Sequence, residues 1–219
     1  MLNNNHDTYR HQGLRTRLIQ ELRQKGIKDE LVLKAIGTVP RHLFIDRGFI
    51  NFAYSDKAFP IAAGQTISQP FTVAQQTQLL GVRVDETVLE VGTGSGYQAA
   101  VLVLLGAKLY SIERQPELYK KTSVLLNSLG YQLRMYLGDG YKGLPQISPF
   151  DKILVTAGAP VIPRDLLEQL KIGGVMVIPV GDKKQIMTRI VRISDSDFEQ
   201  EELGECAFVP MLTGIEQIK

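Results

Sequence analysis

The chain has 219 residues and a net charge of +2, with 44% apolar and 22% charged residues. This composition is typical of a folded globular protein and argues against an intrinsically disordered chain. The small charge, without a concentrated stripe of lysine and arginine, argues against a nucleic-acid-binding protein. The single cysteine, Cys206, excludes an internal disulfide and indicates a reducing compartment, so we expect a cytoplasmic protein.

The N-terminal third combines predicted helices with an irregular segment. Residues 1–7 are polar and are expected to fray, and we find neither a signal sequence nor an apolar run that would span a membrane. Leucines at every fourth position predict a helix over residues 8–25. A second, short helix is expected after Asp29 as its N-cap, and a third after Pro70. The segment 40–70 shows no sustained period and is expected to be irregular but packed.

From Thr87 onward, short β-branched runs alternate with helical segments that end at glycine. Near-continuous apolar runs are typical of parallel strands buried on both faces. They occupy residues 87–91, 108–113, 133–137, 151–157 and 175–180. The alternation predicts a doubly wound, mostly parallel α/β sheet. The last two apolar segments, within residues 185–194 and 202–210, have no helix between them and are expected to form antiparallel edge strands.

The length and the pattern together predict a Rossmann-like α/β fold in a single domain over residues 1–219. Within it, an N-terminal helical and irregular lead-in is expected over residues 1–80. A βα core that binds the cofactor is expected over residues 81–180, and C-terminal strands over residues 181–219.

The strongest motif is "VLEVGTGSGYQAA", in which three glycines follow a predicted strand and precede a helix. Glycine there allows a sharp turn and a close approach of a ligand to the backbone. Tyr97 replaces the third glycine of a dinucleotide-binding G-x-G-x-x-G motif. The acid Glu90 suits a cation better than a pyrophosphate, which favours S-adenosylmethionine with its sulfonium and ammonium groups. The residues of this motif predicted to bind it are Glu90, Gly92, Thr93, Gly94, Ser95 and Gly96.

Two further acids follow the next two strands. Glu113 ends the second strand, where a carboxylate can accept hydrogen bonds from both ribose hydroxyls of an adenosine. Asp139, in "GDG" after the third strand, is placed to accept the adenine amino group. Each has a simpler interpretation, a solvated strand-end charge for Glu113 and an Asp-Gly turn for Asp139. Their shared location at the carboxyl ends of parallel strands favours a common binding site.

The segment "GQTISQPF", residues 64–71, is polar but contains no acid or base. On local sequence alone, Ser68 is a candidate N-cap for the helix that starts near Pro70. A capping role and a contact with a substrate do not exclude each other.

Signatures of several other functions are missing. There is no Tyr-x-x-x-Lys pair of a short-chain dehydrogenase and no Asn-Pro-Pro-Tyr or Asp-Pro-Pro-Tyr motif for nucleic-acid amines. Cys206 lies far from the place expected for a thiol that attacks cytosine. His6, His11 and His42 are not expected to form a ligand cluster, so we assign no metal.

Eight segments together resemble the protein-L-isoaspartate (D-aspartate) O-methyltransferase family over nearly the whole chain. They are "VPRHLF", "AYSDKAFPI", "GQTISQP", "VLEVGTGSGYQAAVL", "GDG", "PFDKILVTAGAP", "IPRDLLEQLKIGGVMVIPVG" and "FVP". The resemblance implies a class I methyltransferase fold with S-adenosyl-L-methionine as donor and S-adenosyl-L-homocysteine as product. It further implies that the acceptors are proteins and peptides carrying L-isoaspartate.

The resemblance also implies roles for single residues. Ser68 matches the family's active-site serine, and Thr66 and Ile67 are expected to contact the substrate with it. Cofactor contacts beyond the glycine loop are implied for Gln65, Glu113, Arg114, Asp139, Gly140 and Thr213. Around Thr213 the tail "MLTGI" departs from the family's spacing. We expect a monomer that binds neither nucleic acid nor membrane.

Three alternatives remain open from the sequence. A methyltransferase for a small molecule or another protein group would share the sheet and the loop. A nicotinamide-dependent oxidoreductase is disfavoured by Tyr97, and an inactive cofactor-binding module is disfavoured by the intact polar residues.

Overall fold

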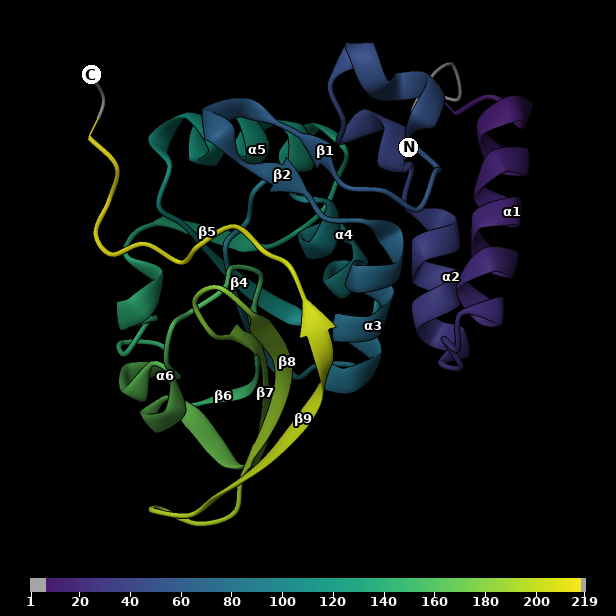
Figure 1. Ribbon diagram of the computed structural model, residues 1–219. Coiled ribbons are helices and arrows are strands. Elements are labelled where there is room, and N and C mark those ends of the chain that lie inside the picture. Colours follow the sequence, from purple (N-terminus) through teal and green to yellow (C-terminus); the bar gives the residue numbers. More distant parts are fainter. Residues whose placement is uncertain (1–6, 218–219) are drawn as a thin grey trace.

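A seven-stranded sheet forms the centre of the molecule, in the order β5-β4-β3-β6-β7-β8-β9 (Figure 1). The computed structural model describes residues 7–217. Strands β3 to β7 are parallel, and β8 and β9 add antiparallel strands at one edge. The strands are β3 (Thr87–Val91), β4 (Lys108–Glu113), β5 (Arg134–Leu137), β6 (Phe150–Val155), β7 (Leu170–Val180), β8 (Gln185–Arg192) and β9 (Phe198–Cys206). The predicted mostly parallel sheet with antiparallel C-terminal strands is confirmed.

Residues 7–217 form six α-helices, of which the last four contact the sheet while the first two pack on the third and fourth. Local sequence explains where several of them begin and end. Asp29 caps the second helix by accepting hydrogen bonds from the backbone N–H groups of Leu31 and Val32. Gly81, with φ of 62°, ends the third in the left-handed conformation that glycine adopts easily. The helices are α1 (Tyr9–Gln24), α2 (Glu30–Thr38), α3 (Pro70–Leu80), α4 (Tyr97–Leu104), α5 (Pro116–Ser128) and α6 (Arg164–Glu168).

Two apolar cores lie on opposite faces of the sheet. Neighbouring residues of a strand point to opposite faces, and in β3 Val88 joins one cluster while Leu89 joins the other. The first cluster includes side chains from α1 to α5, and the second includes Leu166 of α6 and Leu144. The N-terminal helices therefore share a core with the sheet. The division of the chain at residues 80 and 180 stays a prediction.

The structure differs from the sequence-based boundaries near the C-terminus. The helix expected before the last parallel strand is short, and β7 already begins at Leu170. A register shift in its pairing with β6 and a φ of 78° at Gly173 accommodate the early start. Strand β9 ends at Cys206, so the following residues form an irregular tail.

A short two-stranded ribbon in the irregular segment was not predicted. Strand β1 (Phe59–Pro60) pairs antiparallel with β2 (Thr66–Ile67). Each strand has two residues, which is too short to produce an alternating pattern in the sequence. The ribbon carries the polar segment of residues 64–71 toward the sheet (Figure 1).

The strand order reverses direction at β3, because β4 lies on one side of β3 and β6 lies on the other. In open α/β sheets ligands bind beside the carboxyl ends of the strands at such a switch point. Among the described helices, none combines the length and apolar character needed to cross a membrane.

Candidate active site

A cleft lies at the carboxyl ends of β3, β4 and β6. The ribbon segment forms one side, the glycine loop and strand ends form the floor, and the C-terminal tail contributes a further wall. Predicted site residues that line it are Gln65, Thr66, Ile67, Ser68, Gly92, Thr93, Gly94, Ser95, Glu113, Arg114 and Gly140. Most residues predicted from distant segments are therefore brought together. Gly96, Glu90, Asp139 and Thr213 do not line the cleft.

The glycine loop is closely packed against its surroundings. Gly92 has φ of 97°, and a Cβ atom there would lie 2.5 Å from Thr156 Oγ1. Gly96 has φ of 85°, and a Cβ atom would lie 2.8 Å from Thr122 Cγ2. Both positions require glycine for its backbone conformation and for its lack of a side chain. The loop thus exposes its backbone to the cleft as the motif predicted.

Glu113 fixes the loop from the end of β4. Its side chain is buried, Oε2 accepts a hydrogen bond from the Gly94 backbone N–H at 2.8 Å, and Oε1 accepts one from the Gln115 N–H at 2.9 Å. A carboxylate oxygen can accept more than one hydrogen bond, so both oxygens keep acceptor capacity. The predicted contact with ribose hydroxyls is compatible with this geometry.

Glu90 lies beneath the loop and not in the cleft. It is fully buried, Ser111 Oγ donates a hydrogen bond to Oε2, and Thr93 Oγ1 bonds the Ser111 hydroxyl at 2.6 Å. Within the described chain, Oε1 has no partner. Burial raises the pKa of Glu90 to about 8, so this carboxyl is mostly protonated at pH 7. The argument that Glu90 attracts a cation does not apply to this neutral form, and its cofactor contact stays a prediction.

The Ser68 hydroxyl is free of the helix that follows it. The N-cap of α3 is Gln69, which makes no side-chain capping bond. The backbone N–H of Phe71 instead donates to Asp56 Oδ1 at 2.7 Å. Across residues 7–217, Ser68 makes no side-chain hydrogen bond, and it lines the cleft. The N-cap interpretation of Ser68 is therefore not supported.

The C-terminal tail is hydrogen-bonded to Asp139 and Arg114, two residues predicted to contact the adenosine of the cofactor. Asp139 accepts hydrogen bonds from the backbone N–H groups of Tyr141 and Gly214, at 2.9 and 2.8 Å. Arg114 Nε donates to the Gly214 carbonyl at 3.1 Å, and Nη2 donates to Glu216 at 2.8 Å. Both carboxylate oxygens of Asp139 are thus engaged by backbone, and Thr213 is exposed on the tail. Their cofactor contacts stay predictions.

Several lining residues were missed by the sequence analysis. Some lie within segments that carried the family resemblance, namely Tyr97, Gln98, Thr156, Ala157, Val209 and Pro210, but no role was inferred for them. Gln76, Met211 and Leu212 lie outside those segments and gave no signal. Gly158 bonds both Val209 and Met211 through backbone atoms, which brings the tail to the cleft. The missed residues include Gln76, Tyr97, Gln98, Thr156, Ala157, Val209, Pro210, Met211 and Leu212.

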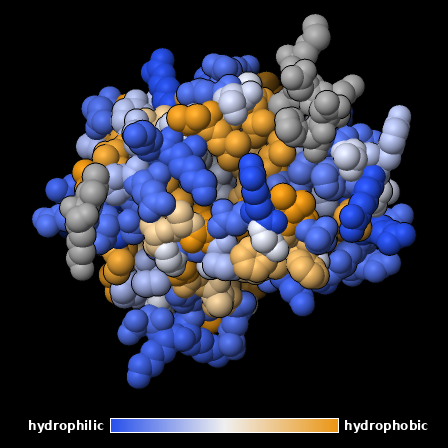
Figure 2. All heavy atoms as spheres, turned by 90° about the horizontal axis from the view of Figure 1, so that it is seen from above, coloured by the Kyte–Doolittle hydropathy of each residue, from blue (hydrophilic) through white to orange (hydrophobic). Residues whose placement is uncertain are grey.

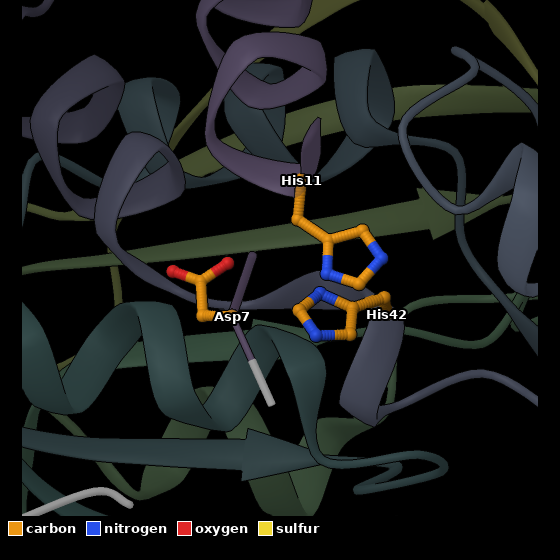
Figure 3. Close-up of side chains that lie close together, drawn as sticks. All are labelled: Asp7, His11 and His42. Carbon is orange, nitrogen blue, oxygen red and sulfur yellow. The ribbon is translucent and has the colours of Figure 1, made fainter. Parts of the chain in front are cut away.

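A histidine pair lies away from the cleft residues and corrects one expectation. The rings of His11 and His42 stack with centroids 3.8 Å apart, and ligand atoms of both lie within 4.8 Å of an Asp7 oxygen (Figure 3). Two of the three histidines therefore do cluster, whereas His6 lies outside the described residues. Both Asp7 oxygens accept hydrogen bonds from Arg15, and His42 Nδ1 bonds the Tyr54 hydroxyl at 2.7 Å.

Arg15 already compensates the only carboxylate of this group. Partial burial raises the pKa of Asp7, but the hydrogen bonds and charge of Arg15 outweigh it, so the pKa is lowered overall. A divalent cation would have to compete with this guanidinium for Asp7. The assignment of no metal stays a prediction. Asp7 belonged to the stretch expected to fray; residues 1–6 of that stretch lie outside the described range, whereas Asp7 is held by Arg15.

Comparison with known proteins assigns the chain to a family. The model of a family described as protein-L-isoaspartate(D-aspartate) O-methyltransferase matches residues 13–216. The chain belongs to this family. The protein-L-isoaspartate O-methyltransferase of Christiangramia forsetii is 62% identical over 207 residues, which cover 94% of this chain and 97% of the relative. That of Flavobacterium psychrophilum is 58% identical with the same coverage.

Solved structures share the fold. A protein-L-isoaspartate O-methyltransferase structure superimposes with a TM-score of 0.82 at 27% identity over 90% of this chain, and this chain spans 65% of that longer one. A Plasmodium falciparum protein of the same description, solved with S-adenosyl-L-homocysteine, gives a TM-score of 0.79 at 21% identity and covers 90% of this chain. The family and fold expected from the sequence are confirmed, and the oxidoreductase alternative is wrong.

Proposed function

We propose that the chain is a repair methyltransferase in which Ser68 orients the acceptor. It transfers a methyl group from S-adenosylmethionine to the free α-carboxylate of L-isoaspartyl residues in damaged proteins and peptides. The observation that carries the proposal is the placement of Ser68, with a free hydroxyl, across one cleft from the glycine loop and Glu113. Figure 2 shows apolar side chains interspersed among polar ones on the face seen from above, and a mixed surface of this kind suits a polypeptide acceptor.

The cleft fits the cofactor by the chemistry of its walls. The charged residues among those lining it are Glu113 and Arg114, so the described residues provide no set of cations for a pyrophosphate. Glu113 holds acceptor capacity at the strand end, and the loop allows close backbone approach at Gly94. Bound there, S-adenosylmethionine supplies an electrophilic methyl group on a positively charged sulfur. We assign its adenosine to Glu113, Arg114, Asp139 and Gly140, and the rest to Gln65, the loop and, through the tail, Thr213.

The acceptor needs no general base. An isoaspartyl residue carries a free α-carboxylate, whose ordinary pKa keeps it ionised at pH 7. The protein's task is to exclude water from this carboxylate and to hold it about 3 Å from the methyl carbon, an orientation effect that contributes roughly 7–11 kcal/mol. Thr66, Ile67 and Ser68 are the residues that we assign to this task.

Ser68 suits the orienting role because a hydroxyl donates one hydrogen bond without protonating the carboxylate. Its oxygen is a weak nucleophile without an adjacent base, and no described residue activates it by a hydrogen bond. The methyl ester formed on the acceptor closes to a succinimide faster than the parent acid, because methoxide leaves more readily than hydroxide. Hydrolysis then restores part of the damaged sites to normal aspartate.

We propose three further properties. The single half-buried Cys206 supports a cytoplasmic protein. The mild net charge supports a protein that binds neither nucleic acid nor membrane surfaces. Exposed large apolar side chains, such as Leu31, Val84 and Ile172, come from separate elements, which supports a monomer.

A pair of peptides tests the function. The protein is incubated with radiolabelled S-adenosylmethionine and either an L-isoaspartyl peptide or its L-aspartyl twin. We expect methyl ester only on the isoaspartyl peptide. Equal labelling of both, or labelling of neither while S-adenosylmethionine binds, would favour the alternative methyltransferase with another acceptor.

A further inference from the structure

A buried aspartate holds the first turn of α3 from a distant part of the chain. Asp56 lies between the 3₁₀ segment Arg47–Phe52 and the ribbon, and its side chain is 4% exposed. Oδ1 accepts a hydrogen bond from the Phe71 N–H at 2.7 Å, and Oδ2 accepts one from Lys25 Nζ at 2.6 Å. Phe71 is the second residue of α3, and Pro70 before it has no N–H. Asp56 therefore satisfies the first available donor of the helix, which a capping side chain would normally do.

The segment around Asp56 is itself held by a buried cation. Arg41 is fully buried, and it donates hydrogen bonds to the carbonyl oxygens of Ala53 at 2.9 Å and Lys57 at 3.2 Å. Its guanidinium lies 4.9 Å from the ring centroid of Tyr97, which lines the cleft. Burial lowers the pKa of Arg41 to about 10, so the group remains charged at pH 7 and attracts the Asp56 carboxylate. Asp56 is thus fixed relative to both α3 and the wall of the cleft.

This arrangement has a consequence for Ser68, three residues before Phe71. A serine just before a helix readily turns its hydroxyl to the first free N–H groups. Here the Phe71 N–H is already bound to Asp56, and Ser68 lines the cleft without a side-chain hydrogen bond in the described chain. Removal of the Asp56 carboxylate would leave the Phe71 N–H without a hydrogen-bond partner. The segment that carries Ser68 lies within reach of this free donor.

We propose that Asp56 is a positioning residue for methyl transfer, which caps α3 in place of Ser68 and so keeps the Ser68 hydroxyl available to the acceptor carboxylate. The proposal rests on the function assigned to Ser68 above. Asp56 does not line the cleft and acts on the reaction only through the segment of residues 66–68.

A double-mutant cycle with Asp56→Ala and Ser68→Ala tests this coupling. With an isoaspartyl peptide, Asp56→Ala is expected to lower kcat roughly 10- to 100-fold, the effect of a displaced orienting group. In the Ser68→Ala background the same change is expected to lower kcat less than about threefold, because the group through which Asp56 acts is already gone. The dissociation constant of S-adenosylhomocysteine should change by no more than a few-fold in either background.

Three variants separate positioning from general stability. Asp56→Asn keeps an acceptor for Phe71 and should retain kcat within about threefold of the unmodified protein, since asparagine and aspartate cap equally well. Lys25→Ala removes only the half-exposed partner of Asp56 and should leave kcat unchanged. Asp29→Ala is the matched control, because it removes a side-chain cap from α2, outside the cleft, and should lower the melting temperature without lowering kcat.

The outcomes are distinct. An equal loss of kcat from Asp56→Ala in both backgrounds, or a loss of kcat in Asp29→Ala as large as in Asp56→Ala, would overturn the positioning role while the proposed function stands. Absence of isoaspartyl methylation by the unmodified protein would overturn the function itself. If Asp56→Ala does not fold, Asp56→Ser takes its place with the same expectations, because its hydroxyl is too short to reach the Phe71 N–H.

Discussion

The acids of the site have different environments, and the sequence predicted their positions better than their charge states. Glu113 is predicted from its distance after the glycine loop and does line the cleft. Glu90 is predicted from its place before the loop, yet it is fully buried and its pKa is raised to about 8. The burial of Glu90 depends on the packing of β3 between β4 and β6. The local sequence around Glu90 does not indicate this packing. Residue roles that depend on desolvation therefore need the structure.

Glu90→Gln is expected to change how stability depends on pH. The folded protein keeps the Glu90 proton up to about pH 8, whereas the unfolded chain releases it near its ordinary pKa of 4.5. Between these values the unfolded state binds fewer protons, so rising pH lowers the free energy of unfolding, by up to about 1.4 kcal/mol per pH unit from this group. Denaturant titrations at pH 5 and pH 8 should show a smaller loss for the variant. Identical losses in both proteins would show that Glu90 is not protonated in the fold.

At the scale of elements, long periodic segments were predicted well and short or remotely capped ones were not. Strands β3 and β4 have the predicted bounds because continuous apolar runs mark buried parallel strands. The two-residue ribbon gave no pattern, and α6 ends at Glu168 because Leu170 joins β7. Local sequence offered Ser68 as a candidate cap of α3, whereas Asp56 bonds the Phe71 N–H from fifteen positions earlier. Such a contact depends on tertiary structure and leaves no local signal.

Gly92→Ala is expected to disable the loop without unfolding the sheet. The new Cβ would lie 2.5 Å from Thr156 Oγ1, and φ of 97° is unfavourable for alanine. The loop has to shift, and we expect S-adenosylhomocysteine affinity to fall at least tenfold, a change of about 1.4 kcal/mol. Isothermal titration calorimetry measures it, with Gly130→Ala as control, since that glycine also has a positive φ of 81° but open space around it. Equal affinities for the Gly92 and Gly130 variants would contradict the close packing of the loop.

At the scale of the whole molecule, the site is assembled from segments that are far apart in the chain. These segments are the ribbon, the strand ends and the tail. They meet because β3 lies between β4 and β6 in the sheet and because the chain later passes over the ends of these strands. The tail crosses this end of the molecule after β9 (Figure 1). The tail is attached to Arg114 and Asp139 through the backbone of Gly214, and to Arg114 also through the side chain of Glu216. These contacts join residues about a hundred or seventy-five positions apart, so no local pattern indicated them.

Truncation after Leu212 tests the role of the tail. It removes the partners of Arg114 and Asp139 at Gly214 but keeps Met211, which is packed in the core. We expect S-adenosylhomocysteine to bind roughly tenfold more weakly. The corresponding loss of binding free energy is about the net contribution of one hydrogen bond. Circular dichroism should show an unchanged fold. Unaltered affinity would show that residues 213–219, including Thr213, have no part in the cofactor site.

The central claim is that Ser68 orients the acceptor carboxylate and does not hold the cofactor or the helix. The most direct test is kcat of Ser68→Ala for an isoaspartyl peptide, measured together with the dissociation constant of S-adenosylhomocysteine. The account predicts a fall in kcat of roughly 100-fold, about 2.7 kcal/mol of transition-state stabilisation, with cofactor affinity unchanged within a few-fold. An unchanged kcat, or a loss of affinity equal to the loss of kcat, would contradict it.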